Sequence, residues 1–397
     1  MTNKTNKIKI AFIGQKGIPT QQGGIEKHVE ELTARLVNAG LDVTVYSRPY
    51  YTKKPQGIYK YKGIRIVNLP SIKSKNLDAI SHTFISTIHA LTQDYDVIHY
   101  HGVGPSLLSW IPRIFAPRTK VISTFHCIDR NHQKWGHFAK LSLYIGEWSA
   151  CRFPHRTISV SRALKQYCQI KFNQDVVYIP NGVKTKPVKN AEKILAQYGL
   201  AKGGYIISVC RLVRHKGIHT LIKAYNKLHT NKKLVIVGGS SQTDDYVKEL
   251  YELAKGNKNI IFTGEKSGNE LTVLFKNAYL FAQPSESEGM SIALLESMAY
   301  GVPALVSDIA ENREAIGDCG LEFKNKSISD LAQQLSFAFK HPRSMKQKAI
   351  EAKARAAKCY DWTDITKETS MVYDEAIAES DAVRKAKKVM RVYQVNS

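Results

Sequence analysis

The sequence predicts two α/β domains, each built on a mostly parallel, doubly wound sheet, that face each other across a central cleft. Three observations lead to this fold class. The chain has 397 residues, about twice the length of an ordinary domain. Short apolar, β-branched runs alternate with helix-length segments along most of the chain, as in parallel sheets with helices on both faces. A polar, basic stretch near 183–200 divides these runs into two series.

The predicted strands can be placed in order. The first run, 8–13, ends in Gly14, and after a glycine-rich loop the segment 26–36 has apolar residues at helical spacing. The other strands of the first series are expected at 42–47, 64–69, 97–100, 121–125 and 157–160. The strands of the second series are expected at 205–209, 234–237, 260–263, 280–283 and 304–307.

These series set the expected domain limits. We expect an N-terminal domain over 1–183, with the turn dipeptide Asn181-Gly182 at its end, and a C-terminal domain over 184–365. The tail, 366–397, is expected to be helical and to pack back on the N-terminal domain. Its basic end, 384–391, is typical either of a solvated helix face or of a membrane-surface contact.

The composition excludes several classes of protein. With 43% hydrophobic and 23% charged residues, the chain matches a folded globular protein. The six cysteines form no C-x-x-C pair, which argues against a zinc ribbon or a redox pair. The N-terminus has no leader-like apolar stretch, and no run of 18 apolar residues occurs, so we expect neither secretion nor a membrane span but a cytoplasmic protein.

The net charge of +24 requires an anionic partner: nucleic acid, an acidic membrane surface or a phosphorylated substrate. Residues 1–183 carry 25 basic and 10 acidic side chains, and 184–397 carry 33 and 24. The first half is therefore the more basic. Because no helix-turn-helix, zinc-finger or RNA-recognition signature accompanies the charge, nucleic acid is not the expected partner, although a basic nucleic-acid-binding protein stays a remote alternative.

The most informative segment is 283–303, QPSESEGMSIALLESMAYGVP, in which a strand ends, a Ser/Glu/Gly loop follows and a helix begins near Ser291. Glu288 then lies in the loop and Glu296 about two turns into the helix, so that the two carboxylates face one cleft about 12 Å apart. Hydroxyl groups at the two ends of a nucleotide sugar fit this spacing. The amides of Gly289, Met290 and Ser291 between them form a helix N-terminus suited to a diphosphate.

A basic pair follows the first strand of the second series. Arg211 and Lys216 leave its carboxyl end in the string VCRLVRHKG, where a planar fork and a point charge together neutralise a phosphate pair. Cations placed there stabilise the negative charge that develops on a leaving nucleoside diphosphate. On its own, R-x-x-x-x-K in a basic protein is equally well explained as surface charge.

The glycine-rich loop over 14–26 lacks both G-x-G-x-x-G and the G-x-x-x-x-G-K-[ST] phosphate loop, so a dinucleotide dehydrogenase and a P-loop enzyme lose support. The adjacent Gly23 and Gly24 still allow close approach of the backbone to a phosphate.

Histidines also follow predicted strands. His126, at the end of VISTFH, is placed to contact a substrate hydroxyl in the cleft, or else is a packed, hydrogen-bonded histidine. His99 and His101 share one strand face and form a weak metal candidate, because no acidic ligand motif accompanies them. We expect no metal and no cofactor.

Taken together, these strings resemble the retaining glycosyltransferases of the GT-B fold, specifically the large family 4. The resemblance covers nearly the whole chain through GGIEKHVEELTARL, VIHYHG, ISTFH, IPNGV, VCRLVRHKG, IFTGE and ESEGMSIALLESMAYGVP. Segments such as SRPYYTKKP and HYHGVGPSLLSWIPR are similar to a bacterial, rhamnosyltransferase-like subgroup involved in cell-surface polysaccharide assembly.

The resemblance implies two Rossmann-like domains, the first on the acceptor side and the second binding a nucleoside-diphosphate sugar. Glu288 would contact hydroxyls of the donor sugar and Glu296 the ribose, while Arg211 and Lys216 would hold the diphosphate. Further implied positions, by matching motifs, are Gly23 and Gly24 at the diphosphate, His126 near the reacting carbon, and the segment 262–265, with Gly264, beside the base.

The function implied is transfer of a hexose or 6-deoxyhexose to a saccharide acceptor, in some cases lipid-linked, with retention at the anomeric carbon and without a metal. A peripheral contact with an anionic membrane at the inner face of the cell membrane would fit such an acceptor. Two departures from the family pattern, Cys210 and the run Cys127 to Arg130 after His126, leave the sugar and acceptor open. A nucleotide-sugar epimerase or a phosphorylase of the same fold is the alternative.

Overall fold

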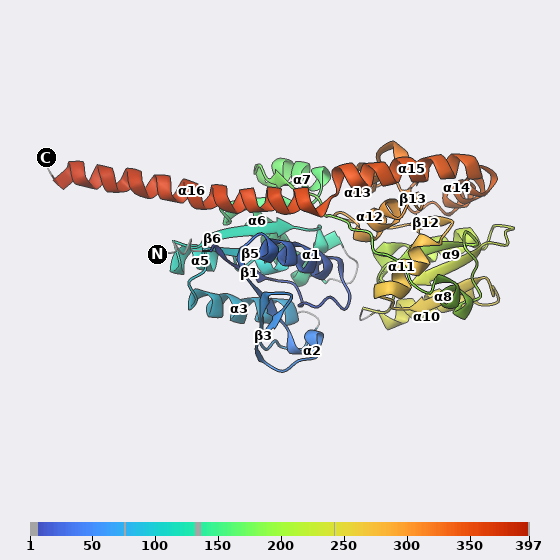
Figure 1. Ribbon diagram of the computed structural model, residues 1–397, viewed down its shortest axis with the longest axis horizontal. Helices are drawn as coiled ribbons and strands as arrows, with labels where there is room; N and C mark the ends of the chain where they lie inside the picture. The colour runs from blue at the N-terminus through green and yellow to red at the C-terminus, as the bar shows by residue number, and fades with distance from the viewer. Residues whose placement is uncertain (1–6, 75–76, 132–135, 242, 396–397) are drawn as a thin grey trace.

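The computed structural model describes residues 7–74, 77–131, 136–241 and 243–395, and the side chains up to residue 379 apart from Asn131. Figure 1 shows two α/β lobes side by side, with the last helix running from the C-terminal lobe along the N-terminal one and past it. Within the described residues, no helix has the length and apolar character needed to cross a bilayer.

The N-terminal lobe is built on an eight-stranded sheet of order β3-β4-β2-β1-β5-β6-β7-β8. Its strands are β1 Lys9–Ile13, β2 Asp42–Ser47, β3 Gly57–Tyr61, β4 Ile64–Asn68, β5 Val97–His101, β6 Lys120–Phe125, β7 Arg156–Ser159 and β8 Val177–Tyr178. All neighbouring strands are parallel except β3 and β4. The central strands read as continuous apolar runs because helices bury both of their faces.

The C-terminal lobe repeats this plan with a six-stranded parallel sheet of order β11-β10-β9-β12-β13-β14. Its strands are β9 Tyr205–Val209, β10 Lys233–Val237, β11 Ile260–Gly264, β12 Leu280–Gln283, β13 Ala304–Ser307 and β14 Leu321–Phe323. In both sheets the strand order reverses beside the first strand, at β1 and at β9, where ligands of open α/β sheets bind. The predicted fold class is confirmed.

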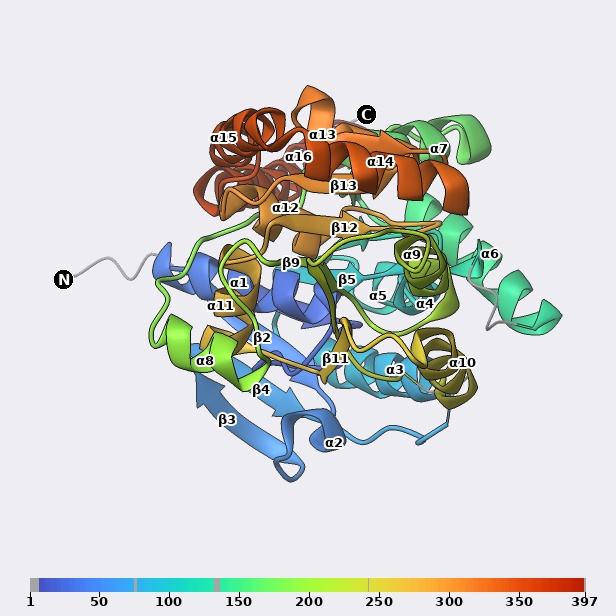
Figure 2. The ribbon, with the colours of Figure 1, turned by 90° about the vertical axis from the view of Figure 1, so that its right-hand side faces the viewer.

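Helices cover both faces of each sheet (Figure 2). Those of the N-terminal lobe are α1 Gly24–Asn38, α2 Pro49–Thr52, α3 Asp78–Leu91, α4 Val103–Ser106, α5 Trp110–Phe115, α6 His137–Arg152 and α7 Arg162–Phe172, with the 3₁₀ turn Asp129–Asn131. The helices after β8 are α8 Ala191–Gln197, α9 Ile218–Tyr225, α10 Asp244–Ala254, α11 Gly268–Lys276, α12 Ile292–Ala299, α13 Ala310–Ile316, α14 Ile328–Lys340, α15 Pro342–Cys359 and α16 Trp362–Val395, with 3₁₀ turns at Arg214–Lys216 and Gly317–Cys319.

The chain passes between the lobes twice, and the two passages lie side by side. Val183 forms a parallel bridge with Asp361, and its N–H donates to the carbonyl oxygen of Tyr360 at 2.8 Å. The stretch 183–200, expected to be a linker, contains α8, which packs on α11. Leu195 is the buried side chain of α8, and one buried position within seven residues is too weak a pattern to predict a helix.

Helix α16 belongs to the core of the N-terminal lobe. Trp362, Ile365, Val372 and Tyr373 are buried in the same cluster as β1 and α1, and the Tyr373 hydroxyl is bonded to His99 Nδ1 at 2.8 Å. The backbone of the basic segment 384–391 is helical, but its side chains lie outside the described residues.

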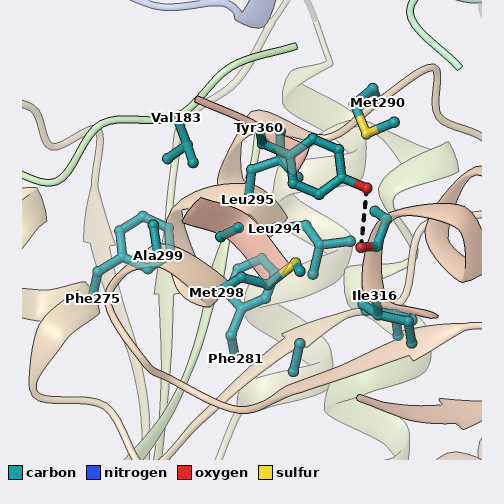
Figure 3. Close-up of a cluster of buried hydrophobic side chains, with 14 of the residues drawn as sticks. Val183, Phe275, Phe281, Met290, Leu294, Leu295, Met298, Ala299, Ile316 and Tyr360 are labelled. Carbon is teal, nitrogen blue, oxygen red and sulfur yellow. Dashed lines mark hydrogen bonds between the residues drawn. The ribbon is translucent and has the colours of Figure 1, made fainter. Parts of the chain in front are cut away.

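The core of the C-terminal lobe fixes the helix that carries Glu296. Leu294, Leu295 and Met298 of α12 pack against Phe281 of β12 and Tyr360 (Figure 3). The Tyr360 hydroxyl donates to the carbonyl oxygen of Ala315 at 3.2 Å, so the only polar atom of that ring is satisfied inside the cluster. Because one side of α12 is packed in this core, the opposite side, which carries Glu296, is held in a fixed position at the cleft.

Candidate active site

The loop after β1 brings the first lobe to the cleft. Gly14 has φ +118°, and a Cβ atom built there would lie 2.5 Å from the carbonyl oxygen of His101. Gly23, with φ +107°, precedes α1 as its N-cap. Both backbones are accessible only to glycine. The loop therefore crosses the carboxyl ends of β1 and β5 closely, and the N-terminus of α1 points across the cleft, where Gly24 lies opposite Ile292.

The loop after β12 brings the second lobe to the same place. The Ser291 hydroxyl caps α12 by accepting from Leu294 N–H at 3.3 Å and donates to Gln283 Oε1. Gln283 in turn donates from Nε2 to Asn312 Oδ1 at 2.7 Å. This buried network fixes the position of the 284–291 loop. The predicted start of the helix near Ser291 is confirmed, and the Ser291 hydroxyl serves the cap.

Glu288 meets Lys216 at the carboxyl end of β9. Lys216 Nζ donates to Glu288 Oε1 at 2.6 Å, and both side chains are largely buried. Arg211 and Lys216 both lower the pKa of the Cys127 thiol, which burial raises well above its usual range. Since Cys127 comes from the N-terminal lobe, both cations act across the cleft. The structure therefore places Lys216 against Glu288, and Arg211 lies between β9 and Lys216 on the same loop.

Glu296 forms an ion pair with Lys27 of α1, with side-chain exposures of 13% and 31%. The pair joins the two lobes. Lys27 did not stand out in the sequence, because a lysine in the first turns of an amphipathic helix is ordinarily a solvated residue. Its pairing with Glu296 shows that the second predicted carboxylate faces the cleft.

The two lobes also touch through backbone. A Cβ atom built on Gly289 would lie 1.5 Å from the carbonyl oxygen of His126, so only glycine fits this contact. Asn181 bridges the same region, because its Nδ2 donates to the carbonyl oxygen of Met290 at 2.7 Å and its Oδ1 accepts from His28 Nδ1 at 2.9 Å. Met290 itself is buried, with its side chain in the core.

Three buried histidines meet behind this contact. His101 Nδ1 and His126 Nε2 share a hydrogen bond of 3.0 Å, and His28 packs edge-on against His126 at 5.0 Å between ring centroids. Burial lowers the pKa of His28 to about 4 and lowers the pKa of His101 and His126 well below 6.5. These rings are therefore neutral near pH 7 and can donate and accept hydrogen bonds but carry no charge.

The three histidines that meet in the structure are not the pair His99 and His101 that formed a weak metal candidate in the sequence. Both ring nitrogens of His99 are occupied, by the Tyr373 hydroxyl at 2.8 Å and by Thr124 Oγ1 at 2.7 Å. His99 is thus a packed histidine. Among the described residues, the group with nitrogens close enough to share a metal ion, within 4.8 Å, is instead His28, His101 and His126.

A cavity of about 340 Å³ lies beside the Glu288 loop. It is lined by Ile128 from the N-terminal lobe and by residues of the C-terminal lobe that include His215, Glu286, Glu311 and Asn325. Burial and the charge of Glu288 raise the pKa of the Glu311 carboxyl. Carboxylates, an amide and an imidazole around a polar cavity of this size are groups that bind sugar hydroxyls.

The remaining predicted positions can now be placed. Gly264 ends β11, at the outer edge of the sheet, and no atom lies within 4 Å of a Cβ built on it. Its strand lies two strands from β9, the strand that precedes Arg211, and its carbonyl oxygen accepts from Gly238 N–H at 3.0 Å. Sequence reasoning missed Lys27, His28 and Asn181. For Asn181 the string IPNGV was the available signal.

Two models of known protein families match the chain. The family described as Glycosyltransferase Family 4 matches residues 22–186, and the family described as Glycosyl transferases group 1 matches residues 190–356. Each match covers one lobe, and their order along the chain is that of the two sheets.

Individual proteins are also similar to this chain over most of its length. An uncharacterized glycosyltransferase of Methanocaldococcus jannaschii is 27% identical over 93% of this chain and 99% of its own length. Sucrose-phosphate synthase of Thermosynechococcus elongatus superposes with a TM-score of 0.81 at 20% identity, covering 94% of this chain and 100% of that one. HepE of Anabaena, solved with UDP and glucose, superposes with a TM-score of 0.77 at 20% identity, covering 93% and 100%.

The two facing α/β lobes have the GT-B architecture. The chain is a glycosyltransferase of the group 1 family, with a family 4 domain at its N-terminus.

Proposed function

We propose that the protein transfers a hexose or 6-deoxyhexose from a nucleoside-diphosphate sugar to a saccharide acceptor, with retention at the anomeric carbon and without a required metal ion. The observation that carries this proposal is the contact between Lys216 and Glu288 beyond the carboxyl end of β9, on the loop that also carries Arg211. Two cations beside a carboxylate suit a diphosphate next to sugar hydroxyls.

The cations would bind the leaving group. Arg211 and Lys216 would hold the diphosphate, with Lys216 exchanging its hydrogen bond to Glu288 for one to a phosphate oxygen. Glu288 then accepts from a hydroxyl of the donor sugar. Two fixed positive charges stabilise the charge that develops on the diphosphate as the sugar leaves, which is the contribution that a metal supplies in other transferases.

The remaining positions would complete the donor site. Glu296 would exchange Lys27 for the hydroxyls of a ribose, and the backbone at Gly23 and Gly24 would approach the diphosphate from the first lobe. His126, neutral and held by His101, would donate or accept a hydrogen bond at the sugar. HepE, solved with UDP and glucose, supports a uridine or related nucleotide as the first donor to test.

Retention follows from attack on one face of the sugar. The acceptor oxygen bonds to the anomeric carbon on the side from which the phosphate leaves, the bond from that carbon to the phosphate oxygen breaks, and the leaving phosphate takes the proton of the acceptor hydroxyl. The cavity lined by Glu286 and Glu311 would bind a sugar ring of donor or acceptor. Assembly of a bacterial cell-surface polysaccharide, with a rhamnosyltransferase-like specificity, is the proposed role.

The first test is a thermal-shift titration with UDP, GDP, ADP and dTDP, with and without magnesium, because a ligand of the folded state raises the unfolding midpoint. A shift by one nucleotide that does not depend on magnesium supports the proposal. NMR of the product from the matching sugar nucleotide then gives the anomeric configuration. Inversion, or turnover without an acceptor as an epimerase would show, contradicts it.

A further inference from the structure

The N-terminal lobe exposes large apolar side chains on neighbouring helices. On α6, Phe138, Leu141, Ile145 and Trp148 are exposed and recur three or four residues apart, so they form one outward stripe. On α5, Ile114 and Phe115 are exposed as well. We call these six residues the α5–α6 surface. Phe138 is 89% exposed and Phe115 is 68% exposed, so these two side chains contribute little to the core of the lobe.

The two helices are held together from beneath. The Ser149 hydroxyl of α6 donates to the carbonyl oxygen of Ser106 at 2.7 Å and lies 3.4 Å from the Ser109 hydroxyl, directly before α5. Helix α3 packs on α5 and adds the exposed Phe84 and Ile88. The apolar side chains are therefore carried by a fixed scaffold, and apolar surface of this extent marks an interaction site.

The exposed charged side chains on α5, on α6 and in the residues next to them are all positive. Segments 110–118 and 136–152 contain Arg113, Arg118, Lys140 and Arg152, all exposed, and a single carboxylate, Glu147. The Glu147 side chain is fully buried and accepts from Arg130 Nε at 2.9 Å. Aromatic and aliphatic side chains mixed with exposed lysine and arginine are typical of helices that lie in the interface of an anionic bilayer.

We propose that the α5–α6 surface docks on an anionic membrane, with the apolar stripe among the acyl chains and the four basic side chains at the headgroups. A second copy of the chain is the less favourable occupant, because two surfaces of the same positive sign repel each other. This inference rests on the proposed function in one respect only, namely that the surface would bring a lipid-linked acceptor to the cleft.

The surface is connected directly to the site. Arg130, which holds the inner side of α6 through Glu147 and Tyr167, lies on the loop that also carries His126 and Ile128. Ile128 lines the cavity. Docking through α6 therefore places the acceptor-side loop next to the headgroup layer, where an acceptor with a lipid anchor would enter.

The test is co-flotation of the full chain with vesicles of phosphatidylglycerol or of phosphatidylcholine. We expect binding to phosphatidylglycerol that weakens with added salt, since screening acts on the basic side chains, and little binding to phosphatidylcholine. The double variant Phe138→Ser/Leu141→Ser and the double variant Lys140→Glu/Arg152→Glu should each lower binding to phosphatidylglycerol by about tenfold or more. Ile350→Ser is the matched control, because Ile350 on α15 and Leu141 are both 57% exposed.

Equal binding of the serine variant and the control would overturn the proposal, as would failure of the unaltered chain to float with phosphatidylglycerol. A dimer in sedimentation that the serine variant dissociates would assign the surface to a second copy. Thermal melts and nucleotide titrations of the same variants separate the two proposals. A variant that no longer floats but still binds nucleotide would show that the α5–α6 surface binds the membrane independently of the transferase site. Flotation of a chain that binds no nucleotide would refute the transferase site and leave the membrane surface in place.

Discussion

Gly289 lies against the carbonyl oxygen of His126 so closely that a Cβ atom on residue 289 would be 1.5 Å from that oxygen. The contact joins the donor-side loop of one lobe to the strand end of the other. It is a backbone contact, so its geometry depends on residue 289 having no side chain.

The first prediction concerns this contact. Gly289→Ala should push the lobes apart and lower kcat/KM by about tenfold or more, because a small misplacement of reacting groups is costly. The readout is steady-state transfer from the nucleotide sugar found by titration. Gly136→Ala is the control, since no atom lies within 4 Å of a Cβ built there. Equal activity of the two variants would contradict a catalytic role for the contact.

The second prediction concerns the pair Lys216–Glu288. Either Lys216→Ala or Glu288→Gln should lower kcat by about 10²-fold or more, the scale seen when one stabilising group of a transition state is lost. Circular dichroism should show a folded protein in both cases. Lys255→Ala, which removes an exposed pair with Glu252, should leave transfer unchanged. Near-normal turnover in both site variants would refute the assignment.

The third prediction separates the two partners of Glu296. If Glu296 binds the ribose, Glu296→Gln should raise the KM for the sugar nucleotide by about tenfold, the loss of one charged hydrogen bond. Lys27→Ala should leave that KM equal or lower, because it removes the side chain that competes for Glu296. A parallel rise of KM in the two variants would indicate that the ion pair matters only for joining the lobes.

The strand pattern made most of the fold predictable. The predicted runs 42–47, 205–209, 280–283 and 304–307 coincide with β2, β9, β12 and β13, because buried parallel strands are continuous apolar runs. The missed strands are short or at the edge: β3 is largely exposed and antiparallel, β8 has two residues and β14 has three. Such strands are stabilised by their neighbours more than by their own sequence.

The candidate site was likewise predictable from the sequence only in part. Lys216 and Glu288 follow strands that the pattern identifies, so their meeting could be predicted from topology. The roles of Lys27 and Asn181 depend on how the two lobes face each other, and no spacing within one segment contains that information. Gly264 was assigned by motif, and its place beside the base stays a prediction.

The fourth prediction concerns the attachment of α16. Tyr373→Phe removes the partner of His99 Nδ1 in a fully buried pair and should lower the free energy of unfolding by about 1–3 kcal/mol. Urea denaturation measures the change. Tyr251→Phe is the control, because Tyr251 is exposed on α10. An equal effect of the two substitutions would show that the buried hydrogen bond contributes nothing to holding α16.

The last prediction concerns acid. The pKa of His28 is about 4 in the folded protein against about 6.5 in the unfolded chain, because burial disfavours the imidazolium form. Between these values the unfolded state binds a proton that the folded state does not. Stability should therefore be greatest above about pH 6.5 and should fall by about 1.4 kcal/mol per pH unit for this residue as the pH decreases toward 4. The buried His82 and the half-buried His155 have lowered pKa values of about 3 and about 4 and act in the same direction.

In His28→Asn, urea denaturation between about pH 7 and pH 4.5 should show a slope shallower by about one proton, whatever the loss of stability at neutral pH. An unchanged slope would mean that His28 is protonated in the folded protein, and the neutral histidine cluster assigned to the cleft would then be wrong.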